Sequence, residues 1–257
     1  MAISVIATGK NGVRANSQTT GITVTHGFTL ANDDVLYAFL TQGDDLPVSG
    51  GAWSSSSGGT WVELKNQRTT TGNDHFDGVM RRVVTDAGAE PSTFTFTLNN
   101  SNTNNLVCIV VQVRGADTTT PEDATTTSSL GSDDFTPPNV AITTVTDAAH
   151  VIISHVAIGA STTINSSKTG GAPSGWTLED TVEGDNPGGI NDELFLEVAS
   201  LVKATAGVVT PGDWTGTADD ATSEYGTFAV AVRPATATAN PKGPLGMPLN
   251  GPFGGPI

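Results

Sequence analysis

The sequence predicts an all-β protein: an antiparallel β-sandwich, jelly-roll-like, built from two similar halves and followed by an extended Pro/Gly-rich C-terminal tail. The first observation is composition, because charged residues make up only 14% and aromatic residues 6% of the 257 residues. Gly, Thr, Ser, Asn and Asp are abundant, which favours short strands and turns over helices. The second observation is that apolar and polar residues alternate in many short runs. The third is that the order of these runs repeats along the chain.

The longest apolar run, residues 106–114, is the clearest of the predicted strands. Seven of its nine residues are apolar and five are β-branched, which is typical of a strand buried on at least one face. It is too short to cross a bilayer as a helix, which takes about 20 residues. Cys108 within it is the only cysteine, so we expect it to pack as a small buried apolar residue.

The strands of the first half follow from alternation and from the turn residues between them. An edge strand and a loop are expected within residues 1–21, and a long surface loop rich in Gly, Ser and Asp over 43–59. The other strands of this half are expected at 22–25, 35–40, from 60 to 64, 78–84, 94–98 and 106–114.

The second half repeats this order after a Thr-, Ser-, Asp- and Pro-rich bridge, 117–139. Residues 106–116 and 225–235 both end in the pattern apolar-x-Val-Arg-x-Ala, with Arg114 and Arg233 separated by 119 positions. Earlier matches have an offset of about 115, which indicates insertions in the loops. The matched segments are 22–25 with 140–145, 35–40 with 151–156, 59–62 with 174–178, 76–84 with 194–202, and 87–88 with 206–207.

The sandwich is expected to cover residues 1–235, with halves of about 20–116 and 139–235. Each half offers only four or five strands, few for an independent two-sheet core, so we favour strands of both halves interleaved in one sandwich. Two tandem sandwiches are the alternative. In either case Val110→Asp should unfold the domain, whereas changes at Trp53, expected in a loop, should be tolerated.

The tail, residues 236–257, has a different composition. Five prolines and several glycines disfavour regular structure, yet apolar residues recur where an inert linker would carry Ser, Glu or Lys. A frayed terminus is one interpretation. The other is an extended peptide that docks in a groove on another protein or another copy. The docking residues would be Leu245, Met247, Leu249, Phe253 and Ile257.

Motifs for catalysis or metal binding are missing from the sequence. It has no Gly-x-Ser-x-Gly, phosphate-loop, dinucleotide-binding or His-Glu-x-x-His pattern, so neither a catalytic residue nor a resident cofactor is expected. His150 and His155, five residues apart on a strand, should face opposite sides and share no metal ion. His75 lies in a polar turn and should be solvated. Acidic clusters leave Ca²⁺ open as a ligand, although turn formation explains them more simply. These clusters lie at 44–45, 133–134, 185–186, 191–193 and 219–220.

Two tryptophans are candidates for an exposed aromatic platform that stacks on sugars. Val62 and Leu64 form an apolar pair, which sets Trp61 on the opposite, polar face unless a bulge intervenes. Trp53 lies in the expected loop. Packing in the core is the alternative for Trp61. In the second half, Trp176 is expected to point inward with Leu178.

The net charge and the lack of targeting signals limit the classes of partner and the location that we expect. The net charge of -15 comes from 26 acidic and 11 scattered basic residues, so a nucleic-acid-binding face is not expected. The N-terminus lacks the features of a secretory signal, and no transmembrane segment is present. We therefore expect that the protein does not insert into a membrane and that it assembles in a cytoplasm.

Several elements resemble a sandwich domain that is common in virion proteins of tailed bacteriophages. They are Ser174-Gly-Trp176-Thr-Leu178, Ala206-Gly207, the Val-x-Val-Arg strand ends at Arg114 and Arg233, and the bridge from Arg114 to Ala124. The resemblance covers nearly all of residues 1–235 and excludes the tail. It implies a non-enzymatic virion component without catalytic residues: a head decoration, a head fibre or a tail-associated protein.

The leading functional expectation is a capsid decoration or head-fibre protein in the virion, assembled in the bacterial host cytoplasm. Its tail would attach it to other virion proteins of the capsid or tail, and a homotrimer would be in line with known fibres. The alternative is a carbohydrate-binding module or tail-associated receptor-binding protein that contacts host surface glycans through Trp53 and Trp61. A glycan-degrading enzyme is the weakest hypothesis, because no carboxylate pair stands out among the 26 acids.

Overall fold

The computed structural model describes residues 2–13, 21–43, 51–55, 59–69, 75–98, 106–132, 140–159, 171–184, 193–215 and 224–236. These ranges form fifteen strands, all paired antiparallel, and no helix, which confirms the predicted all-β class. Accordingly, they contain no helix that is long and apolar enough to span a membrane.

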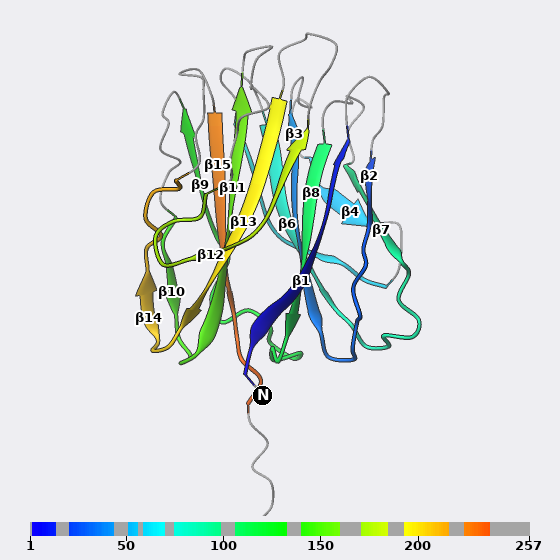
Figure 1. Cartoon of the computed structure of the whole chain (residues 1–257), viewed down its shortest axis with the longest axis vertical. Helices are drawn as coiled ribbons and strands as arrows, with labels where there is room; N and C mark the ends of the chain where they lie inside the picture. The colour runs from blue at the N-terminus through cyan, green and yellow to red at the C-terminus, as the bar shows by residue number, and fades with distance from the viewer. Residues whose placement is uncertain are drawn as a thin grey trace, which may run out of the picture.

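The first half of the chain forms two sheets (Figure 1). Inner sheet 1 has five strands in the order β1-β8-β3-β6-β5, and outer sheet 1 has three in the order β2-β7-β4. The strands are β1 Ser4–Val13, β2 Gly21–Thr25, β3 Val35–Gly43, β4 Trp53–Ser55, β5 Val62–Arg68, β6 His75–Val83, β7 Thr93–Leu98 and β8 Leu106–Arg114.

The second half forms its own two sheets. Inner sheet 2 has the order β12-β13-β11-β15-β9, and outer sheet 2 consists of β10 and β14. The strands are β9 Thr127–Ser132, β10 Ile142–Thr144, β11 Ala149–Gly159, β12 Thr177–Gly184, β13 Glu193–Lys203, β14 Gly207–Val209 and β15 Glu224–Val232.

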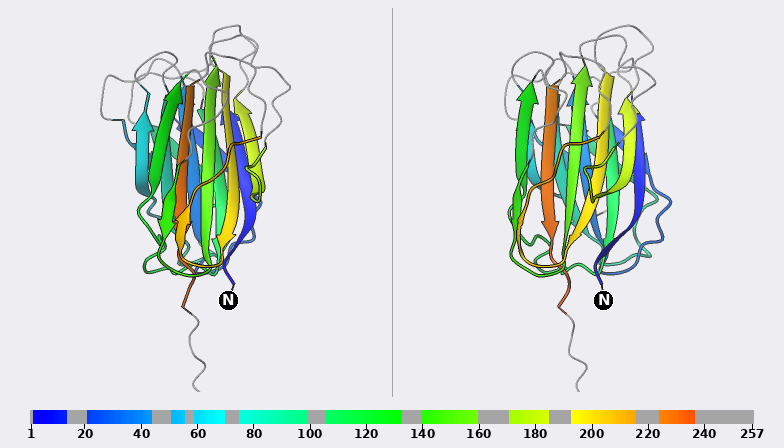
Figure 2. Two further views of the ribbon diagram at one scale, coloured as in Figure 1. Left: turned by 90° about the vertical axis from the view of Figure 1, so that its left-hand side faces the viewer. Right: turned by 60° about the vertical axis from the view of Figure 1, so that its left-hand side comes forward.

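The four sheets stack in layers, with the two inner sheets face to face in the middle (Figures 1 and 2). One apolar core lies between the inner sheets, a second lies between inner sheet 1 and outer sheet 1, and a third lies between inner sheet 2 and outer sheet 2. Strand β8 shows why its sequence is a continuous apolar run: Val107 and Ile109 enter the central core, while Cys108 and Val110 enter the core beneath outer sheet 1. A strand buried on both faces has no polar side to alternate with.

The predicted duplication is present in the sheet order. The order β1-β8-β3-β6-β5 of inner sheet 1 matches the order of inner sheet 2 when the latter is written from its other edge, as β9-β15-β11-β13-β12. The registers align Val35 with His150 and Val113 with Val232, because each pair has equivalent neighbours across its sheet. The offset is therefore 115 residues at β3 and 119 at β8, as the sequence indicated. The extra residues lie between these strands.

The predicted interleaving of the halves does not occur among the described strands. Each five-stranded sheet is drawn from one half, and the described strands of the two halves are joined by one isolated bridge, Ala116 with Pro234. The expectation was wrong because it did not count the edge strand expected within residues 1–21 in the first half, and because it overlooked β9 in the bridge. With these edge strands each half has enough strands for a large and a small sheet, and the inner faces of the large sheets bury one another.

The two halves are related by an approximate two-fold rotation about an axis parallel to the strands. Strands β8 and β15 end at the same end of the molecule, where Ala116 pairs with Pro234. At the sheet edges β1 contacts β12 and β5 contacts β9. Since β1 corresponds to β9 and β5 to β12, this crossed contact is what a two-fold rotation produces. We call the end at which β8 and β15 finish the base; it is at the bottom of Figure 1.

Candidate functional site

The two tryptophans proposed as a glycan platform are buried. The Trp53 side chain is 3% exposed and packs against Phe76, with ring centroids 6.2 Å apart. Trp61 is 8% exposed, and the edges of its ring system meet Phe94 and Phe96 at centroid distances of 5.4 and 4.9 Å. Neither ring presents a face on which a sugar could stack, so the expectation that these two residues are exposed was wrong.

The reason is the number of layers. Trp61 does lie on the face of inner sheet 1 opposite to Leu64, as predicted, but outer sheet 1 covers that face. A bulge between Glu63 and Lys65 follows, and Val62 is 41% exposed at the sheet edge. In the second half Trp176 is partly buried as expected, whereas Leu178, beside the bulge of β12, is 37% exposed.

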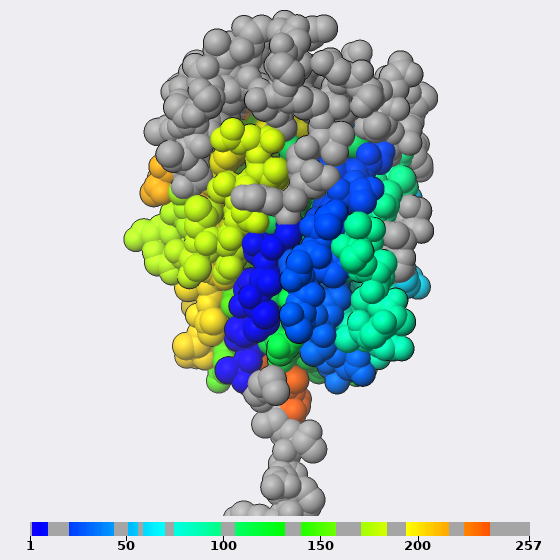
Figure 3. All heavy atoms as spheres, turned by 45° about the vertical axis from the view of Figure 1, so that its right-hand side comes forward, coloured from blue at the N-terminus to red at the C-terminus, as the bar shows by residue number. Residues whose placement is uncertain are grey.

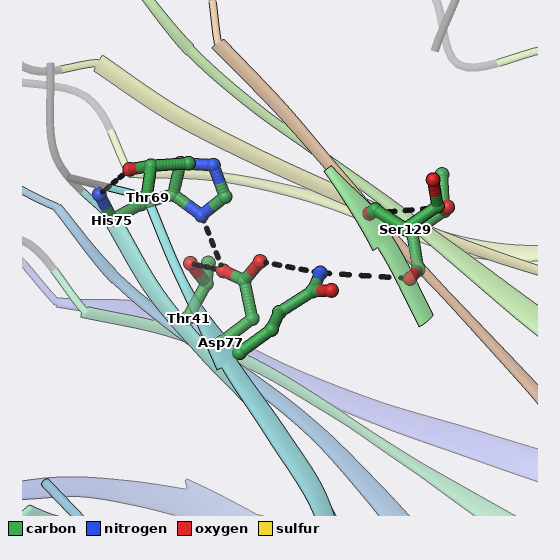
Figure 4. A network of polar contacts seen from close by, with 7 residues as sticks. Thr41, Thr69, His75, Asp77 and Ser129 are labelled. Atoms are coloured by element: carbon green, nitrogen blue, oxygen red, sulfur yellow. Dashed lines mark hydrogen bonds and ion pairs between the residues drawn. The ribbon is translucent and has the colours of Figure 1, made fainter. Parts of the chain in front are cut away.

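A buried polar network lies between the inner sheets at the end away from the base (Figure 4). The carboxylate of Asp77 accepts hydrogen bonds from Thr41 Oγ1 at 2.5 Å and from Gln67 Nε2 at 3.1 Å. His75 Nδ1 lies 2.9 Å from the same carboxylate. The Gln67 amide also reaches across to the carbonyl of Thr227 in β15, at 3.5 Å. Asp77, His75 and Thr41 have no solvent exposure, so the expectation that His75 is solvated was wrong.

A second histidine–carboxylate pair lies on the far face of inner sheet 2. His155 Nδ1 is 2.7 Å from Glu197, which is fully buried and accepts a 3.0 Å hydrogen bond from the backbone of Gly171. The His155 ring stacks on Tyr225 at a centroid distance of 5.5 Å and contacts Trp214 in a tilted arrangement at 5.4 Å. His150 points into the opposite face of the sheet, as predicted, and the two histidines share no site.

The two histidine–carboxylate pairs and Cys108 are packed within the fold. Both histidine–carboxylate pairs are buried, where they hold neighbouring strands and the segment at Gly171 in place. Burial raises the pKa of the Cys108 thiol well above its ordinary value, which fits its expected role as a packing residue. Within the described ranges, no group of three or more His, Cys, Asp and Glu side chains could hold a metal ion.

The base brings together the described chain ends and the bridge between the halves. Ala235 donates a 2.8 Å backbone hydrogen bond to Gly115, and Asp117 donates one of 2.9 Å to Arg233. Gly115 has φ +81° and packs against the carbonyl of Ala2, a place where any side chain would collide with backbone. Figure 3 shows the orange residues near 236 beside the blue N-terminal residues. An open pocket of about 290 Å³ here is lined by Asp33, Ala116, Asp117, Thr118, Ala235 and Thr236.

The repeated arginines explain how the strands end at the base. Arg114, the last residue of β8, pairs with the buried carboxylate of Asp34, and Arg233, the residue after β15, pairs with that of Asp123 at 3.4 Å. Each arginine thus fixes the point where its half meets the base. The last described residues, 233–236, are consequently held in place, and residues 237–257 continue the chain from there.

At the end opposite the base lie the strand ends that lead into segments which the structure does not describe. Gly43 pairs with His75 there, and Ile158 with Glu224. In the sequence, the connections from these ends are rich in Asn, Ser, Thr, Gly and Asp, as in residues 70–74 and 99–105. Most of the acidic clusters considered for Ca²⁺ and the tail residues Leu245, Met247, Leu249, Phe253 and Ile257 also lie outside the described residues.

Comparison of the sequence with protein-family models gave no match, and comparisons with characterised proteins and with solved structures gave no significant one.

Sequence reasoning missed most of the buried polar residues. Asp77, Gln67 and Glu197 lie in strands that are indicated by the strands' other residues, and none of the three belongs to a recognisable sequence motif. The available signal was the placement of a charge inside an otherwise apolar strand, as for Glu197 between Leu196 and Val198. Such a charge requires a buried partner.

Proposed function

We propose that this chain is a non-enzymatic structural protein of a tailed-phage particle, a capsid decoration or head-fibre protein that its C-terminal segment attaches to the particle. The observation that carries the proposal is the placement of the two ends. Residues 233–236 are fixed at the base, while the polar connections between strands depart from the other end. Attachment through residues 237–257 would leave the strand ends at which those connections begin facing away from the particle.

The composition of the segment supports attachment. Five apolar side chains among five prolines are unfavourable in water, and proline limits the conformational entropy lost when an extended peptide binds. The other supporting feature is the layered fold of residues 1–235, which we class as a duplicated β-sandwich of the kind that the phage resemblance implies. The buried histidine–carboxylate pairs give no reason to propose catalysis.

Deletion of residues 241–257 tests the proposal. We expect the shortened protein to keep the thermal unfolding transition of the full chain and to be lost from purified particles. A matched full-length variant replaces the five apolar tail residues with Ser and should be lost to the same extent. A control variant, Lys242→Ser with Asn250→Ser, should be retained. Stoichiometric recovery of the shortened protein with particles would refute attachment through this segment.

A further inference from the structure

The contacts between the inner sheets come in pairs related by the two-fold axis, and in two of these pairs one member holds a histidine–carboxylate pair or an ion pair that the other member lacks. The polar network around Asp77 is one such member. The registers make Leu196 the counterpart of Asp77, and Val107 the counterpart of Gly226. The remaining counterparts are Thr41 with Val156, Gln67 with Val182, and His75 with Leu194.

Gly226 is the residue of the second half that faces the polar member. A Cβ atom on Gly226 would come within 3.0 Å of Asp77 Oδ2, Gln67 Nε2 and His75 Cε1. Since Asp77 and His75 are buried, and Asp77 is hydrogen-bonded to Gln67 and lies 2.9 Å from His75 Nδ1, these side chains cannot move aside without breaking the network. Across the axis the same position is Val107, which packs with Leu196 in the central core.

A second polar member lies nearer the base. Glu122 accepts hydrogen bonds from Tyr37 at 3.2 Å and from Arg81 at 2.5 Å. Its counterpart is Val5, because Val5 pairs with Val113 as Glu122 pairs with Val232. The counterparts of Tyr37 and Arg81 are Ile152 and Ser200, so the equivalent contact across the axis holds no ion pair.

Pairing of two like halves would therefore bring mismatched groups together. Two first halves would place Val107 against the Asp77 network, where Gly226 leaves room that Val107 would fill, and Val5 on Arg81, which leaves this partly buried charge without its carboxylate. Two second halves would place Glu122 against Ile152 and Ser200, and Gly226 against Leu196. The first arrangement overpacks the Asp77 network and the second leaves a void at Gly226, and each leaves a partly buried charge without its partner, all of which are unfavourable.

We infer that the inner face of the first half is a recognition surface for the inner face of the second half and rejects a second copy of itself. The polar residues Asp77 and Glu122, together with Gly226, carry this selectivity, which works by penalising the wrong partner. The consequence is that many copies folding at high local concentration pair their unlike halves and do not join through like ones. The inference does not depend on the proposed function.

Full-length variants test the inference by copying the apolar contact onto the polar one. The first set is Thr41→Val, Gln67→Val, His75→Leu, Asp77→Leu and Gly226→Val, and the second set is Tyr37→Ile, Arg81→Ser and Glu122→Val. Each protein is unfolded in urea, refolded over a range of concentrations, and analysed by size-exclusion chromatography with light scattering. The wild type should return to its starting oligomeric state. The variants should fold and give a fraction of larger species that rises with concentration and exceeds the wild-type fraction several-fold.

Gly226→Val alone is the matched control. It should lower the melting temperature by about 2–12 °C, because the added side chain overpacks a buried contact in a domain of this size. The other four changes of the first set should restore most of that loss. Refolding of both sets without additional larger species would overturn the inference. Failure of both sets to fold would overturn it too, because each set copies contacts that the molecule already makes across its axis.

Discussion

Arg114, the last residue of β8, donates hydrogen bonds of 2.8 Å to both carboxylate oxygens of the fully buried Asp34. Gln112 and the backbone N–H of Ala31 add two more, at 2.6 and 2.7 Å. Burial alone would raise the pKa of Asp34, but the hydrogen bonds from Arg114, Ala31 and Gln112 outweigh it, and the pKa lies below its ordinary value. The carboxylate that anchors the base is therefore ionised at neutral pH.

Replacing Arg114 with Met should destabilise the protein by about 1–3 kcal/mol at pH 7, because Asp34 keeps its charge but loses its cation. The arginine is 34% exposed, which places the cost below that of a fully buried pair. A lowered carboxyl pKa stabilises the folded state above the unfolded value near 3.8 and ceases to do so as the pH falls through the folded value. Urea unfolding at pH 7 and pH 3 should show a difference between variant and wild type that shrinks at pH 3.

Arg233→Met is the control for this prediction. Arg233 lies 3.4 Å from Asp123, whose carboxylate also accepts hydrogen bonds from the backbone of Val145 and Thr146 at 2.6 and 3.0 Å. Each carboxylate thus keeps two other hydrogen bonds, but Asp34 loses two 2.8 Å hydrogen bonds with its arginine, whereas Asp123 loses one contact of 3.4 Å. An Arg233→Met variant that lost more stability than Arg114→Met would contradict the assignment of Arg114 as the stronger anchor.

Val110→Asp should abolish cooperative folding. Val110 is fully buried in the core beneath outer sheet 1, on β8, which lies between β1 and β3. An aspartate there would be a buried charge without a partner, at a cost that exceeds the stability of a typical domain of this kind. Val208→Asp is the matched control, since Val208 is 61% exposed on β14 and should change stability by only about 0.5 kcal/mol. Circular dichroism during thermal unfolding distinguishes the two outcomes.

Trp53→Ala should destabilise the protein by about 3–5 kcal/mol, the usual cost of truncating a buried tryptophan. The sequence alone predicted the opposite, because Trp53 was expected in a surface loop. Its indole instead lies over Gly78, where a Cβ atom would collide with it, and Glu63 accepts a 2.7 Å hydrogen bond from its backbone N–H. Trp53→Phe should cost less. A Trp53→Ala variant with the wild-type urea midpoint would show that the indole contributes no packing energy.

Most of the strands, their duplication and the burial of β8 could be predicted from the sequence, since local alternation and turn residues specify them. The layering could not, because it depends on which faces cover one another. Trp61 illustrates the difference: its side of β5 was predicted correctly, but whether that side faces water is decided by β2 and β7, which come from distant parts of the chain.

The polar network was unpredictable for a related reason. Asp77 and Gly226 are 149 positions apart, and their contact exists only because β6 and β15 belong to sheets that face each other. Neither residue carries a local signal for that contact. The recurrence of Arg114 and Arg233, in contrast, could be recognised in the sequence, because each half has an arginine at the same place and each arginine pairs with a buried carboxylate at the base.

His150 provides a pH-dependent prediction for the central core. It is 4% exposed, and burial lowers its pKa to about 4, against a smaller opposing contribution from the backbone of Ile3. Since the unfolded chain binds a proton near pH 6.5 and the folded one only near pH 4, stability should fall as the pH is lowered between these values, by about 3 kcal/mol in total. His150→Val, which copies its counterpart Val35, should remove this part of the pH dependence. Urea unfolding between pH 7 and pH 4 measures both proteins, and an NMR titration of His150 with a midpoint near 6.5 would contradict the prediction.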